Sequence, residues 1–287
     1  LGYLGHVDML TKFFKSCNDT IRPFAHSIKG VAPDSFNGGS QWRLKGHAEV
    51  PFWRWVCSWA RALRKPSDLG FDDGAFILPE LIENEHIIDD VPAAPGMLFP
   101  LEAKGLKEQR AERRRTIRER CELAAELAHK AEGQSILWCH LNPESELLHE
   151  MTPESVEVSG SNGDSDDEKE EKLIAFARGQ IKNLVTKPTI GAWGLNFQNC
   201  AHMTMFPSNS FEQRYQCIRR AWRFGQKRPV VVDTVTTKGE GEVVSNMQRK
   251  GKAADMLFAN LVREMNNAIS VSESRNMVND VTVPAWL

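Results

Sequence analysis

Several features of membrane, secreted and strongly charged proteins are missing from this sequence. No stretch approaches the roughly 18 consecutive apolar residues of a membrane span, and no signal peptide opens the chain. The six cysteines include no C-x-x-C pair, which argues against a disulfide scaffold and favours a reducing cytoplasm. The formal net charge is only -2, so any nucleic-acid binding has to come from local patches. We therefore expect a cytoplasmic protein without a membrane partner.

Metal-binding patterns are also absent. Cys139-His140 and Cys200-x-His202 combine possible ligands, but both lie in apolar, strand-like runs and neither has a partner pair at zinc-finger spacing. The acidic segment 163–171 reads as a solvated loop and helix start, where carboxylates suit the helix dipole. We expect no metal site in this chain.

The composition is that of an ordinary globular protein. Of the 287 residues, 41% are apolar and 26% charged, enough for one large domain or one domain with an appendage. The chain begins with Leu1 rather than methionine, which is expected of a piece of a longer protein.

The first half predicts two helices around a connector. Apolar residues recur at helical spacing over 51–63, and residues 64–100 are proline-rich and read as an extended connector. A long helix is predicted from about 101 to 132, ending before Gly133. Its many arginines are expected to form a solvated face.

From residue 135 onward, strands and helices alternate. The apolar runs predict five strands, at 135–141, 155–160, 183–187, 200–206 and 229–237. Helices are predicted at 142–151, 167–179, 210–224 and 254–265. This alternation predicts an α/β fold with a parallel sheet and helices on both faces.

The helix predicted at 210–224 has a polar face rich in arginine. Gln213, Gln216, Arg220 and Arg223 fall within an arc of about 80° when each residue turns the helix by about 100°. No acidic residue occurs between residues 213 and 227, whereas exposed helices commonly pair opposite charges. Arginines without partners near the ligand-binding crevice of a parallel sheet predict an external phosphate.

A glycine-containing loop follows the third predicted strand. Residues 186–200 read TKPTIGAWGLNFQNC, with Gly191 and Gly194 before Leu195-Asn196. Glycine lets a backbone approach a ligand closely, although turns need it too. We expect this loop to lie beside the arginine helix.

Three segments together resemble the second RecA-like lobe of superfamily-two helicases, closest to Swi/Snf-type ATPases and phage or prophage DEAD-like helicases. ILWCHLN resembles motif IV, and TKPTIGAWGLNFQ resembles motif V, although Ala192 and Trp193 interrupt its usual glycine pair. QCIRRAWRFGQ matches motif VI, Q-x-x-x-R-x-x-R-x-G-Q, at every defined position. The resemblance covers most of residues 50–265.

The resemblance implies site residues of two kinds. Arg220 and Arg223 would be arginine fingers that reach an ATP triphosphate. The other residues of the nucleotide site would be Gln216, Gly194, Asn196 and Gln226. The residues that contact nucleic acid would be Thr186, Lys187 and Asn142. The resemblance to the Swi/Snf branch favours DNA as the nucleic acid, with RNA as the alternative, in a bacterial or phage-infected cell.

The sequence contains neither a G-x-x-x-x-G-K-[ST] loop nor a D-E-x-H or D-E-x-D box. These elements cradle the phosphates and hold Mg²⁺ in nucleotide hydrolases. We therefore expect an N-terminal RecA-like lobe elsewhere in the protein to hold ATP and Mg²⁺, and this chain alone to be inactive. Residues 1–100 would be the end of that lobe and a connector, 101–270 the C-terminal lobe, and 271–287 a tail.

Two other functions stay open on sequence grounds. One is a RecA-like module that binds nucleic acid or a partner without catalysis. The other is a phosphate-handling enzyme of unrelated parallel-sheet fold, which would need its own base or nucleophile; Asp233 and His202 are the nearby candidates.

Overall fold

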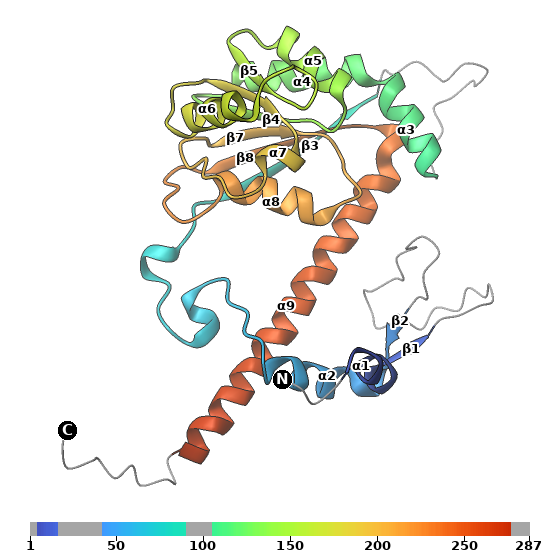
Figure 1. Cartoon of the computed structure of the whole chain (residues 1–287), viewed down its shortest axis with the longest axis vertical. Helices are drawn as coiled ribbons and strands as arrows, with labels where there is room; N and C mark the ends of the chain where they lie inside the picture. Colours follow the sequence, from blue (N-terminus) through green and yellow to red (C-terminus); the bar gives the residue numbers. More distant parts are fainter. Residues whose placement is uncertain (1–4, 17–41, 90–104, 277–287) are drawn as a thin grey trace, which may run out of the picture. The chain divides into compact units, whose positions relative to one another are not determined.

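The computed structural model describes residues 5–16, 42–89 and 105–276 (Figure 1). The chain divides into a core unit, Phe76–Gln248, and a terminal unit formed by Leu1–Ala75 with Arg249–Leu287. The domain boundary predicted at residue 100 lies outside the described residues, as does most of the predicted tail.

The core unit is built on a six-stranded sheet in which all neighbouring strands are parallel. The strand order is β3-β8-β7-β4-β6-β5. The strands are β3 (Leu81–Ile88), β4 (Ser135–Trp138), β5 (Ser155–Val158), β6 (Asn183–Thr186), β7 (His202–Met205) and β8 (Val230–Thr237). All five predicted strands are present, and the predicted parallel α/β sheet is confirmed.

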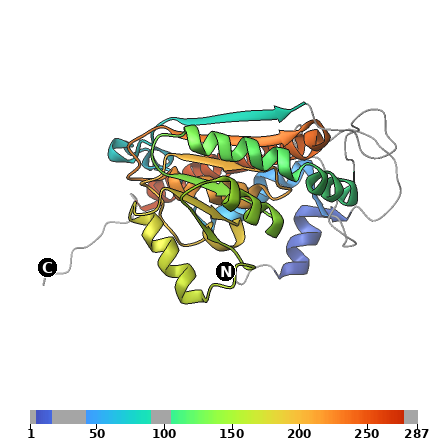
Figure 2. The same ribbon diagram turned by 90° about the horizontal axis from the view of Figure 1, so that it is seen from above.

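The strand β3 was not predicted, so the interpretation of residues 64–100 as a connector is wrong for this segment. It pairs with β8 along its whole length, from Leu81 opposite Val230 to Ile88 opposite Thr237. Figure 2 shows the two strands side by side, β3 in cyan and β8 in orange. Three residues in the middle of β3 are exposed, which fits its place at the edge of the sheet.

Helices cover both faces of the sheet. The helices of the core unit are α3 (Leu106–Arg115), α4 (Ile117–Lys130), α5 (Asn142–Met151), α6 (Asp166–Ala177), α7 (Pro188–Gly191), α8 (Phe211–Ala221) and the start of α9 (Gly241–Asn276). Because side chains alternate along a strand, Leu137 packs with α4 and α5, while Ile136 and Trp138 pack with α6 and α8. Each face therefore has its own apolar core.

The predicted helix at 101–132 is divided into α3 and α4 at Thr116, and its first four residues lie outside the description. The expectation of a wholly solvated arginine face is wrong at Arg120, which is fully buried. Its guanidinium donates to Glu144 of α5 at 2.9 Å and to the carbonyl of Arg113. Removing either partner of a buried ion pair leaves an uncompensated charge, so this pair ties α4 firmly to α5.

The terminal unit contains α1 (His6–Phe13), the antiparallel strands β1 (Phe14–Ser16) and β2 (Trp42–Leu44), α2 (Glu49–Cys57) and most of α9. The helix predicted at 51–63 ends at Cys57, six residues early. Rings of Phe13, Phe52 and Trp55 pack together, so these aromatics form a small core. None of the helices in the described ranges is both long and apolar enough to cross a membrane.

A chain of polar side chains crosses the sheet from β4 to β3. The Ser135 hydroxyl is 2.6 Å from Nδ1 of His202, whose Nε2 is 2.9 Å from Asp233. His86 and Asn84 of β3 hydrogen-bond to the other oxygen of Asp233. Burial alone raises the pKa of Asp233, but these hydrogen bonds outweigh it and hold the pKa well below its usual range.

Acid should therefore destabilise the core unit through Asp233. A carboxyl group with a lowered pKa in the folded state stabilises the protein above its unfolded pKa of about 3.9, and this stabilisation is lost as the pH falls. We expect the urea midpoint to begin to fall as the pH drops below about 4 and to keep falling toward the lowered folded-state pKa. Asp233→Asn should lower the midpoint at neutral pH and flatten this dependence.

Asp166→Asn serves as the control, because the Asp166 side chain is fully exposed at the start of α6. Its midpoint should follow that of the unsubstituted protein at each pH. An equally steep acid dependence in Asp233→Asn would contradict the assignment.

Candidate functional site

The arginine segment lies on α8 and the turn that follows it. α8 joins two adjacent parallel strands, β7 and β8. It therefore runs back along the sheet, from the carboxyl-terminal ends of the strands (the carboxyl edge) to their amino-terminal ends (the amino edge). The helix ends at Ala221, three residues earlier than predicted. Arg223 accordingly lies in the turn, and the predicted common helical face holds only for Gln213, Gln216 and Arg220.

The side chain of Arg220 connects α8 to the glycine-containing loop. One terminal nitrogen donates to the carbonyl of Leu195 at 2.9 Å, and the other donates to Oε1 of Gln216 at 3.1 Å. The Arg220 carbonyl accepts a hydrogen bond from the backbone N–H of Phe197 at 2.9 Å. The structure thus brings Arg220 and Gln216 together with the loop that contains Gly194 and Asn196.

Three arginines at this end of α8 have no carboxylate partner among the described residues: Arg219, Arg220 and Arg223. Arg214, by contrast, forms an ion pair with Glu83 of β3 at 2.6 Å. Burial, and then the positive charge of Arg223, lower the pKa of Arg220 from its ordinary value. Arginine nevertheless stays protonated, so this end of the helix carries uncompensated positive charge.

The position of these charges differs from the expected one. We expected the arginines at the carboxyl edge of the sheet, but Arg220 and Arg223 lie toward the amino edge, near the start of β8. The cause is the antiparallel direction of α8, which begins at the carboxyl edge and ends at the other. Cations at a helix C-terminus also interact favourably with the helix dipole.

Gln226 has a structural position that the motif does not reveal. Its amide is buried and donates to the carbonyls of Gln198 and Cys200 at 3.0 and 2.8 Å. Its carbonyl oxygen accepts from the backbone N–H groups of Lys227 and Arg228, both at 3.0 Å. These bonds hold the turn between α8 and β8, so both the N–H and the carbonyl groups of the amide have partners within the protein.

The expected nucleic-acid contacts fall into two environments. Thr186 is fully buried, and its hydroxyl donates to the carbonyl of Val158 at 2.9 Å. Its side chain therefore stabilises the sheet and is not exposed for contact with nucleic acid. Lys187, directly after β6, donates to the side-chain oxygen of Asn142, the first residue of α5. Lys187 and Asn142 therefore lie at the carboxyl-terminal ends of the β-strands, where their contact with nucleic acid stays a prediction.

The loop after β6 exposes part of its motif. Gly194 has φ +76°, the left-handed region that favours glycine, and both Gly194 and Asn196 are exposed. Trp193, which departs from the usual motif, exposes half of its surface. The exposed backbone of Gly194 and side-chain amide of Asn196 thus flank Leu195, which Arg220 contacts.

The residues considered for an unrelated enzyme, Asp233 and His202, are 4% and 7% exposed and hydrogen-bond to each other within the sheet. Among the described residues, no group of three or more histidine, cysteine, aspartate or glutamate side chains is placed to hold a metal ion.

Sequence reasoning missed a second polar cluster at the opposite end of α8. Ser208, Asn209 and Ser210 follow β7 and face Arg110 and Arg113 of α3. The Ser-Asn-Ser run before an amphipathic helix was the available signal, because such residues cap helices. Nothing in the sequence indicates that α3 lies beside it.

No family model matches the sequence, and no curated protein matches it. Solved structures similar to the chain include the C-terminal part of the Fun30 ATPase domain, at 16% identity and TM-score 0.39 over 44% of this chain and 43% of that one. The Escherichia coli DEAD-box protein SrmB bound to RraA matches at 16% identity and TM-score 0.40, over 47% and 79%. The C-terminal domain of the DEAD-box protein Dbp5 matches at 14% identity and TM-score 0.42, over 60% and 84%.

The chain thus spans less than half of the Fun30 structure that it matches.

The structural role of Gln226 can be tested by substitution. Gln226→Leu keeps the approximate size but leaves buried carbonyl and N–H groups without partners, so it should lower the free energy of unfolding by about 2–4 kcal/mol. Gln216→Leu is the matched control, since Gln216 is only half-buried and, within the described residues, its amide hydrogen-bonds to Arg220 alone. It should cost less than about 1 kcal/mol in urea denaturation. Equal losses in the two variants would rule out the structural role.

Proposed function

We propose that this chain is the C-terminal half of an ATP-dependent helicase or translocase that acts on nucleic acid, DNA rather than RNA. Arg220 and Arg223 would contact the phosphates of ATP, which an N-terminal RecA-like lobe of the same protein would hold together with Mg²⁺. The proposal rests mainly on one observation: Arg220 is hydrogen-bonded to Leu195 of the glycine-containing loop. In addition, neither its guanidinium nor that of Arg223 has a carboxylate partner in the described residues. A triphosphate is the kind of anion that such a pair fits.

Arg220 and Arg223 differ in how firmly the protein holds their guanidiniums for contact with ATP. Three hydrogen bonds to Leu195 and Gln216 orient Arg220, so little side-chain freedom would be lost when an anion binds. Arg223 is half-buried in the turn after α8, and no hydrogen bond involves its guanidinium in the described part of the chain. Guanidiniums that meet the charge developing during phosphoryl transfer stabilise it without further rearrangement.

The hydrogen bond from Arg220 to Leu195 also supports a coupling of the nucleotide site to the nucleic-acid contacts. Leu195 belongs to the loop that begins at the end of β6, and Lys187 precedes this loop beside Asn142. A shift of Arg220 on nucleotide binding would move this loop relative to the strand contacts. Contacts of this kind would address the phosphate backbone, so binding should depend on salt and only weakly on sequence.

Replacing the half-buried Arg223 should strongly lower ATP turnover without abolishing ATP binding. An arginine finger contributes about 10³–10⁵ to the rate of phosphoryl transfer. Arg223→Ala in the full-length protein should therefore lower kcat for DNA-stimulated ATP hydrolysis by about this factor, with ATP affinity nearly unchanged. Hydrolysis is measured by phosphate release, and affinity by equilibrium binding of a fluorescent ATP analogue.

Arg178→Ala is the control, because Arg178 is an exposed arginine of the same unit at the end of α6. It should leave kcat unchanged. Near-normal turnover in Arg223→Ala would overturn the finger assignment. Strand binding by a full-length protein that hydrolyses no ATP would favour the non-catalytic binding module instead.

A further inference from the structure

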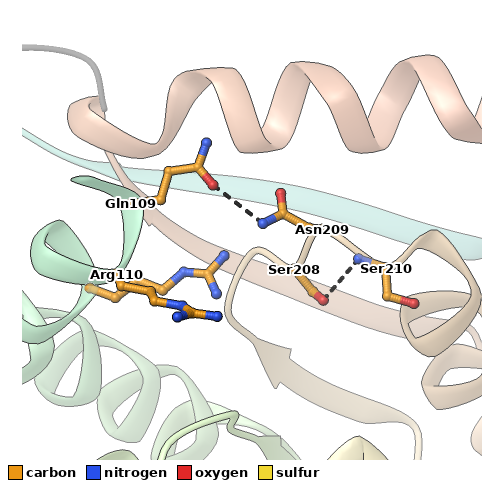
Figure 3. Close-up of a pocket in the computed structure, with 6 residues that line it drawn as sticks. Gln109, Arg110, Ser208, Asn209 and Ser210 are labelled. Atoms are coloured by element: carbon orange, nitrogen blue, oxygen red, sulfur yellow. Dashed lines mark hydrogen bonds between the residues drawn. The ribbon is translucent and has the colours of Figure 1, made fainter. Parts of the chain in front are cut away.

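A cavity of about 370 Å³ lies between α3 and the segment that joins β7 to α8 (Figure 3). Pockets for small molecules commonly measure about 300–1,000 Å³. The lining residues are Gln109, Arg110, Arg113, Ser208, Asn209 and Ser210. Every one of them is polar or cationic and none is a carboxylate, so the lining disfavours a cation or an apolar ligand.

The cavity lies where the topology of the sheet favours ligand binding. The adjacent strands β4 and β7 send their following helices to opposite faces, α5 to one and α8 to the other. The connections therefore separate at the carboxyl edge, and open parallel sheets bind ligands at such points. Residues 206–210, which include half of the lining, form the connection after β7.

Two arginines of α3 give the cavity its charge. Arg113 is held in place, because it donates to Glu240 at 3.1 Å and to the carbonyl of Pro207 at 2.8 Å. Arg110 is exposed, and no carboxylate in the described residues forms an ion pair with it. Figure 3 shows its side chain extending from α3 toward Ser208. One fixed guanidinium that is already neutralised and one without a counter-ion leave a net positive charge at the opening.

The opposite wall consists of neutral polar groups and the start of α8. The Ser208 hydroxyl accepts from the N–H of Ser210 at 3.1 Å, and Asn209 donates to Oε1 of Gln109 at 3.2 Å. α8 has 11 residues, and its N-terminus brings the positive end of the helix dipole to this wall. Glu212 in the first turn is not among the lining residues.

We propose that this cavity is a phosphate-binding site, separate from Arg220 and Arg223 at the other end of α8. Arginine binds phosphate oxygens through paired N–H groups, and hydroxyl and amide groups complete such sites. The phosphate could come from a nucleic-acid strand or from a small phosphorylated molecule. Only the first source depends on the function proposed above.

Calorimetry with inorganic phosphate tests the site without reference to that function. We expect Arg110→Ala to weaken phosphate binding by about tenfold, as loss of a charge-assisted hydrogen bond does. Asn209→Asp, which adds a negative charge at nearly constant size, should abolish the binding. Arg114→Ala removes an equal charge from the same helix outside the lining and should leave it unchanged. Circular dichroism checks that each variant folds.

The salt dependence of single-stranded oligonucleotide binding tests whether the phosphate comes from a nucleic-acid strand. Each lost phosphate contact reduces the slope of log K against log salt by about 0.7 for a single strand. Without ATP, Arg110→Ala should show this reduction, while Arg114→Ala and Arg223→Ala should keep the full slope.

An altered affinity for inorganic phosphate with an unchanged oligonucleotide slope supports the site and assigns it to a small phosphorylated molecule. If Arg110→Ala and Asn209→Asp change neither measurement, the proposal is overturned. Because Arg223→Ala alters only ATP turnover, failure of the proposed function is distinguishable from failure of this site.

Discussion

The direction of α8 determines where the charged groups of the core unit lie. A helix that joins two adjacent parallel strands has to run antiparallel to them, so α8 begins where β7 ends and finishes where β8 begins. Its N-terminus therefore lies with Ser208–Ser210 at the carboxyl edge, and Arg220 and Arg223 lie toward the amino edge. A single element thus separates two positively charged regions by its full length of 11 residues.

The two regions differ in how the helix dipole acts on them. At the N-terminus the dipole adds to the charge of Arg110, which favours an anion. At the C-terminus the dipole is negative, and it stabilises Arg219 and Arg220 in the protein alone. Unpaired arginines at a helix C-terminus are therefore weaker evidence for a ligand than the sequence suggested. The hydrogen bond from Arg220 to Leu195 is the more specific observation, because it links the two motif segments.

The sequence predicted the elements that an apolar pattern defines. It did not predict those features that depend on polar contacts with residues far away in the chain. The five strands from β4 to β8 are apolar runs, and all were predicted. β3 reads LIENEHII, and what holds it at the edge includes the contacts of Asn84 and His86 with Asp233, about 150 residues away in the chain. Likewise, Arg120 looks like any other arginine of its helix until Glu144 is placed opposite it. Motif matching assigned Gln226 to the nucleotide site, whereas the hydrogen bonds that its side chain makes in the structure lie within the protein.

Both positively charged regions combine one fixed arginine with one whose guanidinium lacks a carboxylate partner. Arg113 is held by Glu240 and Pro207, and Arg220 by Leu195 and Gln216, whereas no carboxylate in the described residues pairs with Arg110 or Arg223. A fixed guanidinium loses little conformational entropy on binding, so it favours affinity. An unfixed one loses more, but it can follow an anion that changes position or charge during a reaction. In the proposed sites, the pairing of the two kinds would suit phosphate groups that are first held and then released.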